Sequence, residues 1–537
     1  MRAGGRRPPQ RHGQGRRLGV PGAAAPARGG DPLRERTALV RARPEGRRRR
    51  LSGPRRGRGA LEPRDRARRG PRGHPLRLRP RRPRERLQRG VADRGLTGVL
   101  LVGGASTRFG TRKALARLGG ETLAERAWRL LGETCGETIA VGKRADALPL
   151  PFPVLDDGSS VRAPIAGVVA GLRAARSDVV VVLPVDVPLL SVTSVAALAD
   201  ACADAAVPPT GPLPGAYRKA ALRALEKRLA GGELALRDAL AELDTRVVEL
   251  DPWELVNVNT PADLEAAARR ERALAAVVEV AAAYGLDGLE PRILADWNDT
   301  IVQLRPEPLV ARVATSPLRA DVGTELAREA ALARDVAARG GPALPPATDP
   351  PAGPHRARGL ALTFWPYVDV AGGEPSPAAV AASLRELHDA LGAVATPLPP
   401  LAASLERAGA LEAPSLAEDD RRFLAAGLRE LRRRFDAFGL PERGLHGSPH
   451  GANLLCTRDG LRWIDLDGAC RGPLEWDAAH LAPEAAALFP DLDPEALEVA
   501  RLLVSACVAI WCWAQLGRAP EVDEAARLHL HRLREAL

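Results

Sequence analysis

Two uninterrupted apolar runs constrain the fold of this chain more than any other feature. Gly98–Val102 reads GVLLV and Asp178–Val185 reads DVVVVLPV, with no alternation of polar and apolar residues. Strands that are buried on both faces have this pattern, whereas strands with one solvent face alternate. Helical patterns over 121–131 and 165–175 separate these runs from each other and from a shorter strand at Glu137–Val141. The order predicts an α/β domain with a mostly parallel, Rossmann-like sheet.

The pattern begins at Leu96, and its closing elements are a strand at Arg246–Leu250 and a helix at Thr260–Arg270. Thr260 is suited to the N-cap of that helix and Pro261 to its first turn. We therefore expect a first domain over 96–271 and a second over 272–537. The second domain begins with two paired strands and a helix and is mainly helical afterwards, which predicts an α+β fold. Its expected strands are Thr300–Leu304 and Pro308–Ala314, and its first helix is Thr324–Arg339.

Residues 1–95 differ from the rest of the chain in charge and composition. They contain 31 Arg, no Lys and 7 acidic residues, a net charge of +24, so the other residues carry −12. An Arg-, Pro- and Gly-rich segment without periodicity cannot bury enough apolar surface to fold, which predicts a disordered tail. A basic arm for nucleic acid or acidic lipid and a wrongly assigned start codon are the alternatives. Because the globular part is acidic, we expect no nucleic-acid partner apart from this tail.

The cysteines and the apolar segments bear on where the protein works. Six cysteines are scattered without a C-x-x-C pair, which favours a reducing, cytoplasmic location without structural zinc. The most apolar late stretch, residues 502–516, is shorter than a bilayer span. We expect it to form a buried helix, and we expect no membrane partner.

The stretch Leu96–Ala127, LTGVLLVGGASTRFGTRKALARLGGETLAERA, resembles the signature of the MobA-like nucleotidyltransferases. These include molybdenum cofactor guanylyltransferases and their cytidylyltransferase relatives. Gly103 and Gly104 follow a buried strand, where missing side chains let backbone N–H groups approach phosphates. Arg108 and Lys113 would neutralise a triphosphate, and Lys113 is one of only four lysines among 78 basic residues. The nucleotide-binding set that we expect is Gly103, Gly104, Ser106, Arg108, Lys113 and Gly167.

Two further segments complete this resemblance. Asp186 follows the second apolar run, and ligands bind at the carboxyl ends of strands in such sheets. The resemblance makes Asp186 the carboxylate that binds Mg²⁺, an ion that prefers oxygen ligands. Val256–Leu264, VNVNTPADL, matches the family's late element, in which Asn257 or Asn259 could supply an amide oxygen to the metal or the acceptor. Gly167, in the RAPIAG segment, would leave room for substrate.

The resemblance implies a Mg²⁺-dependent nucleotidyltransferase with Arg108, Lys113 and Asp186 as its catalytic residues. A phosphorylated acceptor would attack the α-phosphate of a nucleoside triphosphate, GTP or CTP, and release pyrophosphate. Molybdopterin is the acceptor that the family suggests. The acceptor phosphate is already ionised, so no general base is required, and residues 96–270 contain no His. Arg112 and Ala163 depart from the family pattern, which leaves the base and the acceptor open.

A second resemblance lies in residues 280–520, to the aminoglycoside phosphotransferase family. His446, Gly447, His450 and Asn453 in LHGSPHGANLL match its catalytic loop, and Asp465 in WIDLDG falls on its metal-binding aspartate. Asp467 could also hold metal.

Two departures from this second family matter more than the matches. Ser448 stands where the family has its catalytic aspartate, and a hydroxyl cannot accept a proton as a carboxylate does. The second domain also contains no lysine, so Arg312 would replace the usual strand lysine, with Glu329 as its helix partner. The alternatives to the transferase as the main activity are therefore a small-molecule kinase and a nucleotide-binding domain without catalysis.

Overall fold

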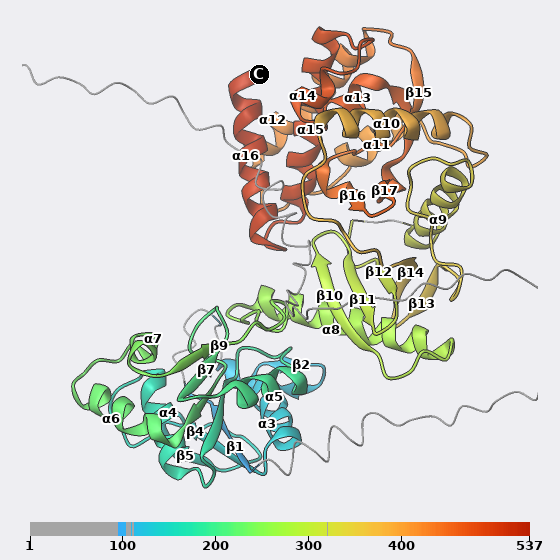
Figure 1. The fold of residues 1–537 in the computed structure, drawn as a ribbon. Coiled ribbons are helices and arrows are strands. Elements are labelled where there is room, and N and C mark those ends of the chain that lie inside the picture. The colour runs from blue at the N-terminus through green and yellow to red at the C-terminus, as the bar shows by residue number, and fades with distance from the viewer. Residues whose placement is uncertain (1–94, 104–108, 110–111, 319–320) are drawn as a thin grey trace, which may run out of the picture.

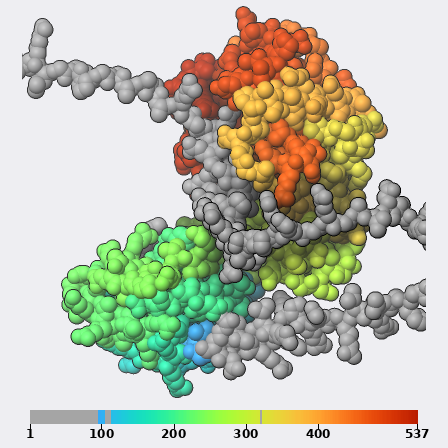
Figure 2. All heavy atoms as spheres, viewed as in Figure 1, coloured from blue at the N-terminus to red at the C-terminus, as the bar shows by residue number. Residues whose placement is uncertain are grey.

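The computed structural model describes residues 95–103, 109, 112–318 and 321–537. The tail predicted over 1–95 lies outside these residues, except for Gly95. The described chain forms a first domain around a seven-stranded sheet and a second domain around a five-stranded sheet followed by helices (Figure 1). The space-filling view shows the two domains as two lobes (Figure 2).

The first sheet has the strand order β5-β4-β1-β6-β8-β7-β9. Its strands are β1 (Leu96–Leu101), β4 (Glu137–Gly142), β5 (Val154–Asp156), β6 (Val179–Pro184), β7 (Ala205–Val207), β8 (Gly215–Arg218) and β9 (Thr245–Val247). β1 pairs in parallel with β4 and β6, and β5 and β9 also join in parallel. Only β8 runs against its neighbours β6 and β7. The mostly parallel α/β sheet predicted from the apolar runs is confirmed.

Helices cover both faces of this sheet. One face carries α3 (Leu123–Thr134) and α5 (Val192–Ala201), and the other carries α4 (Pro164–Ala174), α6 (Leu222–Ala230) and α7 (Leu236–Ala239). Side chains of β1 therefore alternate between two apolar cores, Leu100 in the first and Val99 in the second. This burial on both sides explains why β1 and β6 are apolar at nearly every position, with Thr97 of β1 as the exception. A short hairpin, β2 (Arg117–Leu118) and β3 (Glu121–Thr122), precedes α3.

Two glycines bring α4 close to β1. A Cβ atom on Gly167 would lie 2.8 Å from Leu101 Cδ2, and one on Gly171 would lie 2.7 Å from Val99 Cγ1. Carbon atoms that are not bonded do not approach so closely, so α4 could not pack here with larger residues. The contacts of Gly167 in this structure are thus those of helix–sheet packing.

The second domain begins with an antiparallel sheet of order β10-β11-β12-β14-β13. Its strands are β10 (Glu290–Asp296), β11 (Thr300–Arg305), β12 (Leu309–Val313), β13 (His355–Ala357) and β14 (Leu360–Pro366). The helix α9 (Val322–Ala338) packs on this sheet. The rest of the domain contains two small sheets and seven helices. One sheet pairs β15 (Glu442–Leu445) with β18 (Cys470–Pro473), and the other pairs β16 (Leu454–Thr457) with β17 (Gly460–Trp463). The helices are α10 (Pro377–Gly392), α11 (Leu401–Gly409), α12 (Glu418–Asp436), α13 (Leu474–Ala478), α14 (Pro483–Ala486), α15 (Pro494–Ala514) and α16 (Pro520–Ala536). The predicted α+β kinase-like fold is confirmed.

Among the described residues, α15 is the one helix long and apolar enough to cross a membrane. Its residues Leu503, Ala506 and Ala509 are buried against α12 and α16 in the largest apolar core of the second domain. Packing inside that core accounts for its composition, as expected for the stretch at 502–516.

One helix belongs to both domains. α8 (Pro261–Ala283) runs through the boundary at 271 and 272 without a break and is longer than the closing helix predicted at Thr260–Arg270. Its first half packs through Ala267 against the first domain, in a cluster with Phe109 and Leu118. Its second half packs through Val277 against the second sheet. Each half is buried by a different domain, so the whole helix is stabilised only in the complete chain.

The carboxylate of Asp296, at the end of β10, fixes α8 to the second sheet. Its side chain is fully buried, and Oδ2 accepts hydrogen bonds from Arg270 Nε at 2.8 Å and Arg269 Nη2 at 3.0 Å. Thr300 Oγ1 donates to Oδ1 at 2.7 Å. Both arginines lie on α8, so this buried network joins the two domains.

Candidate functional sites

Three of the residues predicted for the transferase site come together at the carboxyl end of the first sheet. The Lys113 ammonium donates a hydrogen bond to Asn259 Oδ1 at 2.7 Å and lies 3.3 Å from Asp186 Oδ2. The side chains of Lys113 and Asp186 are 16% and 27% exposed, so the cluster is sheltered but reachable from solvent. A carboxylate and an amide oxygen thus converge on one cation.

Local structure explains how each residue reaches this point. Lys113 begins a short 3₁₀ helix (Lys113–Leu115) that is anchored by the buried Ala114. Asp186 lies just after β6, and its backbone oxygen accepts a hydrogen bond from Val258 N at 2.8 Å. Val258 is completely buried. The segment that carries Asn259 is therefore held against the end of β6.

The cap of α8 orients Asn259. Asp263 Oδ2 accepts hydrogen bonds from the backbone N–H groups of Asn259 and Thr260, both at 2.8 Å, and Thr260 Oγ1 accepts one from Asp263 N. Asn257 and Asn259 are both exposed on either side of the buried Val258. Asn259 contacts Lys113, whereas among the described residues Asn257 makes no hydrogen bond to Lys113 or Asp186. Of the two alternatives left by the sequence, the geometry favours Asn259.

The donor set fits a magnesium ion. Asp186 Oδ2 and Asn259 Oδ1 are both hard oxygen ligands, and both already face one positively charged group. Mg²⁺ in nucleotide enzymes takes one or two protein oxygens and completes its shell with water and phosphate. These two residues would hold such an ion once the Lys113 ammonium turns toward a bound phosphate.

The glycine loop is described only in part. Gly103 is exposed at the end of β1, and a Cβ atom placed on it would lie 3.7 Å from the Cα atom of Gly142. Three other residues predicted to bind nucleotide lie outside the described residues: Gly104, Ser106 and Arg108.

A second lysine organises the neighbouring loop, and sequence analysis assigned it no role. Lys143 Nζ donates hydrogen bonds to Asp157 Oδ1 at 2.7 Å and to the backbone oxygens of Ser159 and Val161, both at 2.6 Å. The Lys143 and Asp157 side chains are 13% and 7% exposed. Since Lys143 follows Gly142, this loop lies beside the end of β1 where Gly103 begins the glycine loop. The scarcity of lysine was the available signal.

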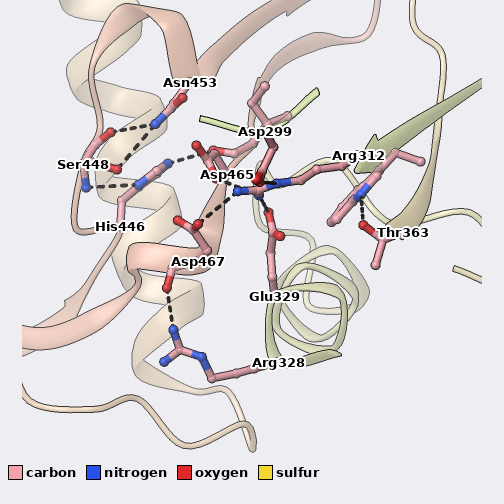
Figure 3. A network of polar contacts seen from close by, with 12 residues as sticks. Asp299, Arg312, Arg328, Glu329, Thr363, His446, Ser448, Asn453, Asp465 and Asp467 are labelled. Atoms are coloured by element: carbon pink, nitrogen blue, oxygen red, sulfur yellow. Dashed lines mark hydrogen bonds and ion pairs between the residues drawn. The ribbon is translucent and has the colours of Figure 1, made fainter. Parts of the chain in front are cut away.

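Two of the predicted kinase-like residues, Glu329 and Asp465, meet at the guanidinium of a third, Arg312 (Figure 3). Arg312 lies on β12, and its side chain is 9% exposed. Burial alone would lower the pKa of Arg312, but the surrounding carboxylates outweigh burial and hold that pKa well above its usual value. The four carboxylates are Glu329 at 2.6 Å, Asp465 at 2.7 Å, Asp299 at 2.8 Å and Asp467 at 2.9 Å.

These carboxylates come from four places in the chain. Glu329 lies on α9, which makes the expected pair between strand and helix. Asp467 lies within the 3₁₀ helix Leu466–Gly468, and Asp465 directly precedes it. Asp465 has a φ of 63°, which non-glycine residues rarely adopt. Asp299 lies in the turn between β10 and β11, and no sequence pattern identified it. The backbone oxygen of Asp467 accepts a further hydrogen bond from Arg328.

The loop that resembles a kinase catalytic loop is rigidly packed. His446 is fully buried, its Nε2 donates to Ile464 O at 3.1 Å, and its Nδ1 accepts from Ser448 N at 3.4 Å. Burial lowers the pKa of His446, so the ring is neutral. Asn453 Nδ2 donates to Ser448 O at 3.0 Å. A Cβ atom on Gly447 would lie 2.1 Å from Gly468 O, so only glycine allows this loop to meet the Asp467 turn.

A buried aspartate that sequence analysis did not single out supports this loop. The Asp477 carboxylate accepts hydrogen bonds at 2.8 Å from the backbone N–H groups of His446 and Gly447 and from His388 Nε2. Burial raises the pKa of Asp477, but these hydrogen bonds and charges outweigh it and leave the pKa below its usual value. Hydrogen bonds within the protein therefore fix the shape of the loop. Ser448 supplies no carboxylate to it.

Known proteins resemble both domains. The sequence profile of the MobA-like NTP transferase domain matches residues 98–247. A molybdenum cofactor guanylyltransferase from Burkholderia ambifaria is 36% identical over 197 residues, which cover 33% of this chain and 96% of that protein. A crystal structure of molybdopterin-guanine dinucleotide biosynthesis protein A from Archaeoglobus fulgidus is 25% identical with a TM-score of 0.29, over 32% of this chain and 97% of the other.

The profile of the phosphotransferase enzyme family matches residues 290–514. A crystal structure of a choline/ethanolamine kinase family protein from Mesorhizobium loti is 18% identical with a TM-score of 0.37, and the match covers 50% of this chain and 94% of the other. Both profiles describe enzyme families, and the two matched regions do not overlap.

Proposed function

We propose, from the premise that the chain belongs through residues 98–247 to the MobA-like NTP transferase family, that its first domain is a nucleotidyltransferase. It would transfer a nucleotide from a nucleoside triphosphate to a phosphorylated acceptor and release pyrophosphate. The observation that carries this proposal is the convergence of Lys113, Asp186 and Asn259 at the end of the sheet. These residues are far apart in sequence, and each occupies a family motif.

The residues of the chain have distinct tasks in this reaction. Asp186 and Asn259 would hold Mg²⁺, which when bound neutralises charge on the triphosphate. Lys113 pairs with a phosphate of the nucleotide, and Gly103 leaves space for phosphate beside the backbone. Arg108 would add a second cation. The N-terminus of α8, directly after Asn259, adds the positive end of its helix dipole to the same region.

Proton transfer needs no protein group in this scheme. The attacking oxygen belongs to a phosphate that is ionised at neutral pH, and the first domain contains no histidine that could act as a base. Catalysis then depends on holding the two substrates in line and on stabilising the charge of the leaving pyrophosphate. The cations and backbone N–H groups around Lys113 are suited to both tasks.

The names of the relatives indicate which substrates to try first. We propose GTP, with CTP as the alternative, as the nucleotide, and molybdopterin as the acceptor, because the Burkholderia relative is named for guanylyl transfer to the molybdenum cofactor. The six free cysteines are consistent with a reducing, cytoplasmic location. The test is a pyrophosphate-release screen of the four ribonucleoside triphosphates with molybdopterin and Mg²⁺. Release with at least one triphosphate that requires the acceptor supports the proposal, and none above the protein-free rate contradicts it.

The second domain supports a phosphotransferase reaction less well. A carboxylate at position 448 would orient and deprotonate a substrate hydroxyl, a contribution of roughly 10²–10⁴ in rate. Ser448 has neither the charge nor the basicity for this. We expect weak or no ATP-dependent phosphorylation by this domain, and Ser448→Asp should leave the rate unchanged or raise it. Rapid ADP formation by the natural sequence that is lost in Asp465→Ala would favour the kinase instead.

A further inference from the structure

The second domain contains a fixed positive charge, Arg312, beside the residue that the resemblance assigns to a metal. By resemblance, Asp465 falls on the metal-binding aspartate of phosphotransferases. In this structure, however, Asp465 Oδ1 lies 2.7 Å from Arg312 Nη1, and Asp467 Oδ2 accepts a hydrogen bond from Arg312 Nη2 at 2.9 Å (Figure 3). The two carboxylates suited to a metal ion are both engaged by one guanidinium.

The remaining contacts of the guanidinium come from the turn between β10 and β11 and from α9. Asp299 accepts from Nε at 2.8 Å, and Glu329 accepts from Nη1 at 2.6 Å. The four carboxylates therefore surround the planar guanidinium and bind its edges. In the part of the chain that the structure describes, no three His, Cys, Asp or Glu side chains are grouped so that they could hold a metal ion. These four carboxylates, which Arg312 already engages, do not fit a divalent cation.

The chemistry of arginine explains why a metal ion does not displace this guanidinium. A lysine ammonium is a point charge with three donors, and it can turn away from one carboxylate to admit a metal ion. A guanidinium has five N–H donors in a fixed plane and stays protonated at any physiological pH. Arg312 is also buried on a central strand, so it cannot swing into solvent. A metal ion that displaced the guanidinium from these carboxylates would leave the Arg312 charge buried without partners.

We propose that the Arg312 guanidinium is the resident cation of this cluster of four carboxylates and that it excludes Mg²⁺ and Mn²⁺ from Asp465 and Asp467. The second domain is then a kinase fold whose metal site has been closed by an internal ion pair. A nucleotide could enter it only as the metal-free anion. This inference concerns the second domain alone and does not depend on the transferase reaction.

Counting bound Mn²⁺ by electron paramagnetic resonance on the full chain tests this proposal. The Asp186→Asn background removes the metal site proposed for the first domain, so any tight Mn²⁺ that remains reports on the second. We expect Asp186→Asn to bind no Mn²⁺ at protein concentrations of about 0.1 mM, which are low enough that weak sites stay empty. Adding Arg312→Lys should restore one Mn²⁺ per chain, because an ammonium engages fewer carboxylates than the guanidinium.

Matched variants separate this effect from a loss of fold. Arg312→Gln removes the charge but keeps a polar side chain, and it should also admit Mn²⁺ and be stabilised by it in thermal unfolding. Arg328→Lys changes a neighbouring arginine that donates a hydrogen bond to the backbone oxygen of Asp467, and this variant should bind no Mn²⁺. Asp465→Asn added to Arg312→Lys should remove the restored ion.

Two results would overturn the proposal. The first is a tight Mn²⁺ in Asp186→Asn that Asp465→Asn abolishes, because the metal would then bind despite the guanidinium. The second is a folded Arg312→Lys variant, verified by near-ultraviolet circular dichroism, that gains no Mn²⁺. A wild-type chain that binds no Mn²⁺ would instead count against the metal site of the first domain, so the two failures are distinguishable.

Discussion

The Lys113 ammonium lies 2.7 Å from Asn259 Oδ1, although 146 positions separate the two residues in the sequence. The contact exists because β1 and β6 are neighbours in the sheet and because Val258 joins the cap of α8 to the end of β6. The 3₁₀ helix that begins at Lys113, the carboxylate after β6 and the start of α8 therefore meet in one cluster. Several measurable consequences come from this arrangement and from the way α8 is held.

The two asparagines should differ in their effects on activity. Asn259→Ala removes an oxygen that faces Lys113, and we expect pyrophosphate release to fall by about 10–100-fold, as for residues that orient a metal site. Asn257→Ala is the matched control, because it changes the same residue type two positions earlier and should have little effect. Steady-state rates with saturating nucleotide measure both. Equal losses in the two variants would contradict the role given to Asn259.

Lys143 should affect nucleotide binding more than the rate of the chemical step. Lys143→Ala removes three hydrogen bonds that shape the loop from Asp157 to Val161. Losing these hydrogen bonds would weaken the binding free energy of the triphosphate by about 1.4 kcal/mol, which raises its KM about tenfold. Lys227→Ala, at an exposed position of α6, should change neither constant. A lower kcat with an unchanged KM would argue against this role.

The buried carboxylate of Asp296 should dominate the stability of the domain junction. In Asp296→Ala, Arg269 and Arg270 lose a buried partner, which costs about 3–5 kcal/mol of unfolding free energy. Asp251→Ala breaks the half-exposed pair with Arg292 and should cost about 1 kcal/mol or less. Chemical denaturation measures both values. Similar small losses would show that the junction does not depend on Asp296.

The second domain should lose stability as the pH falls below about 6.5. Burial lowers the pKa of His446 in the folded state, so the unfolded state binds a proton first. Stability from this residue is present above the unfolded pKa and is lost as the pH falls toward the folded pKa, with a slope of up to about 1.4 kcal/mol per pH unit. His446→Gln should flatten the dependence between pH 6.5 and 5. An unchanged slope in that variant would contradict this account.

The sequence predicted the first sheet well because burial on both faces leaves a direct trace in composition. β1 and β6 are apolar at nearly every position, and this pattern requires helices on both sides. The full length of α8 could not be predicted in the same way. Its second half, after Arg270, is buried by the second domain, so the end of the helix depends on a partner that is distant in sequence.

The candidate sites show the same division between local and distant information. Arg312 and Glu329 could be paired because a kinase fold needs a cation on that strand and this domain has no lysine. Asp299 and Asp477 could not be identified, since Asp299 lies in a turn and Asp477 in the short helix α13, and each meets its partners only in the folded chain. The choice between Asn257 and Asn259 also required the structure, because the burial of Val258 and the cap of α8 decide which side chain faces Lys113.

The central claim is that Asp186 and Lys113 carry the transferase chemistry, and the most direct test is pyrophosphate release by Asp186→Ala and Lys113→Ala. We predict that each rate falls at least about 100-fold relative to the unaltered chain, with unchanged circular dichroism and melting temperature. Asp178→Ala, directly before β6, is the control and should retain full activity, because that side chain is exposed and pairs with Arg218 at the amino end of the strand. Normal turnover by either Asp186→Ala or Lys113→Ala would contradict the account.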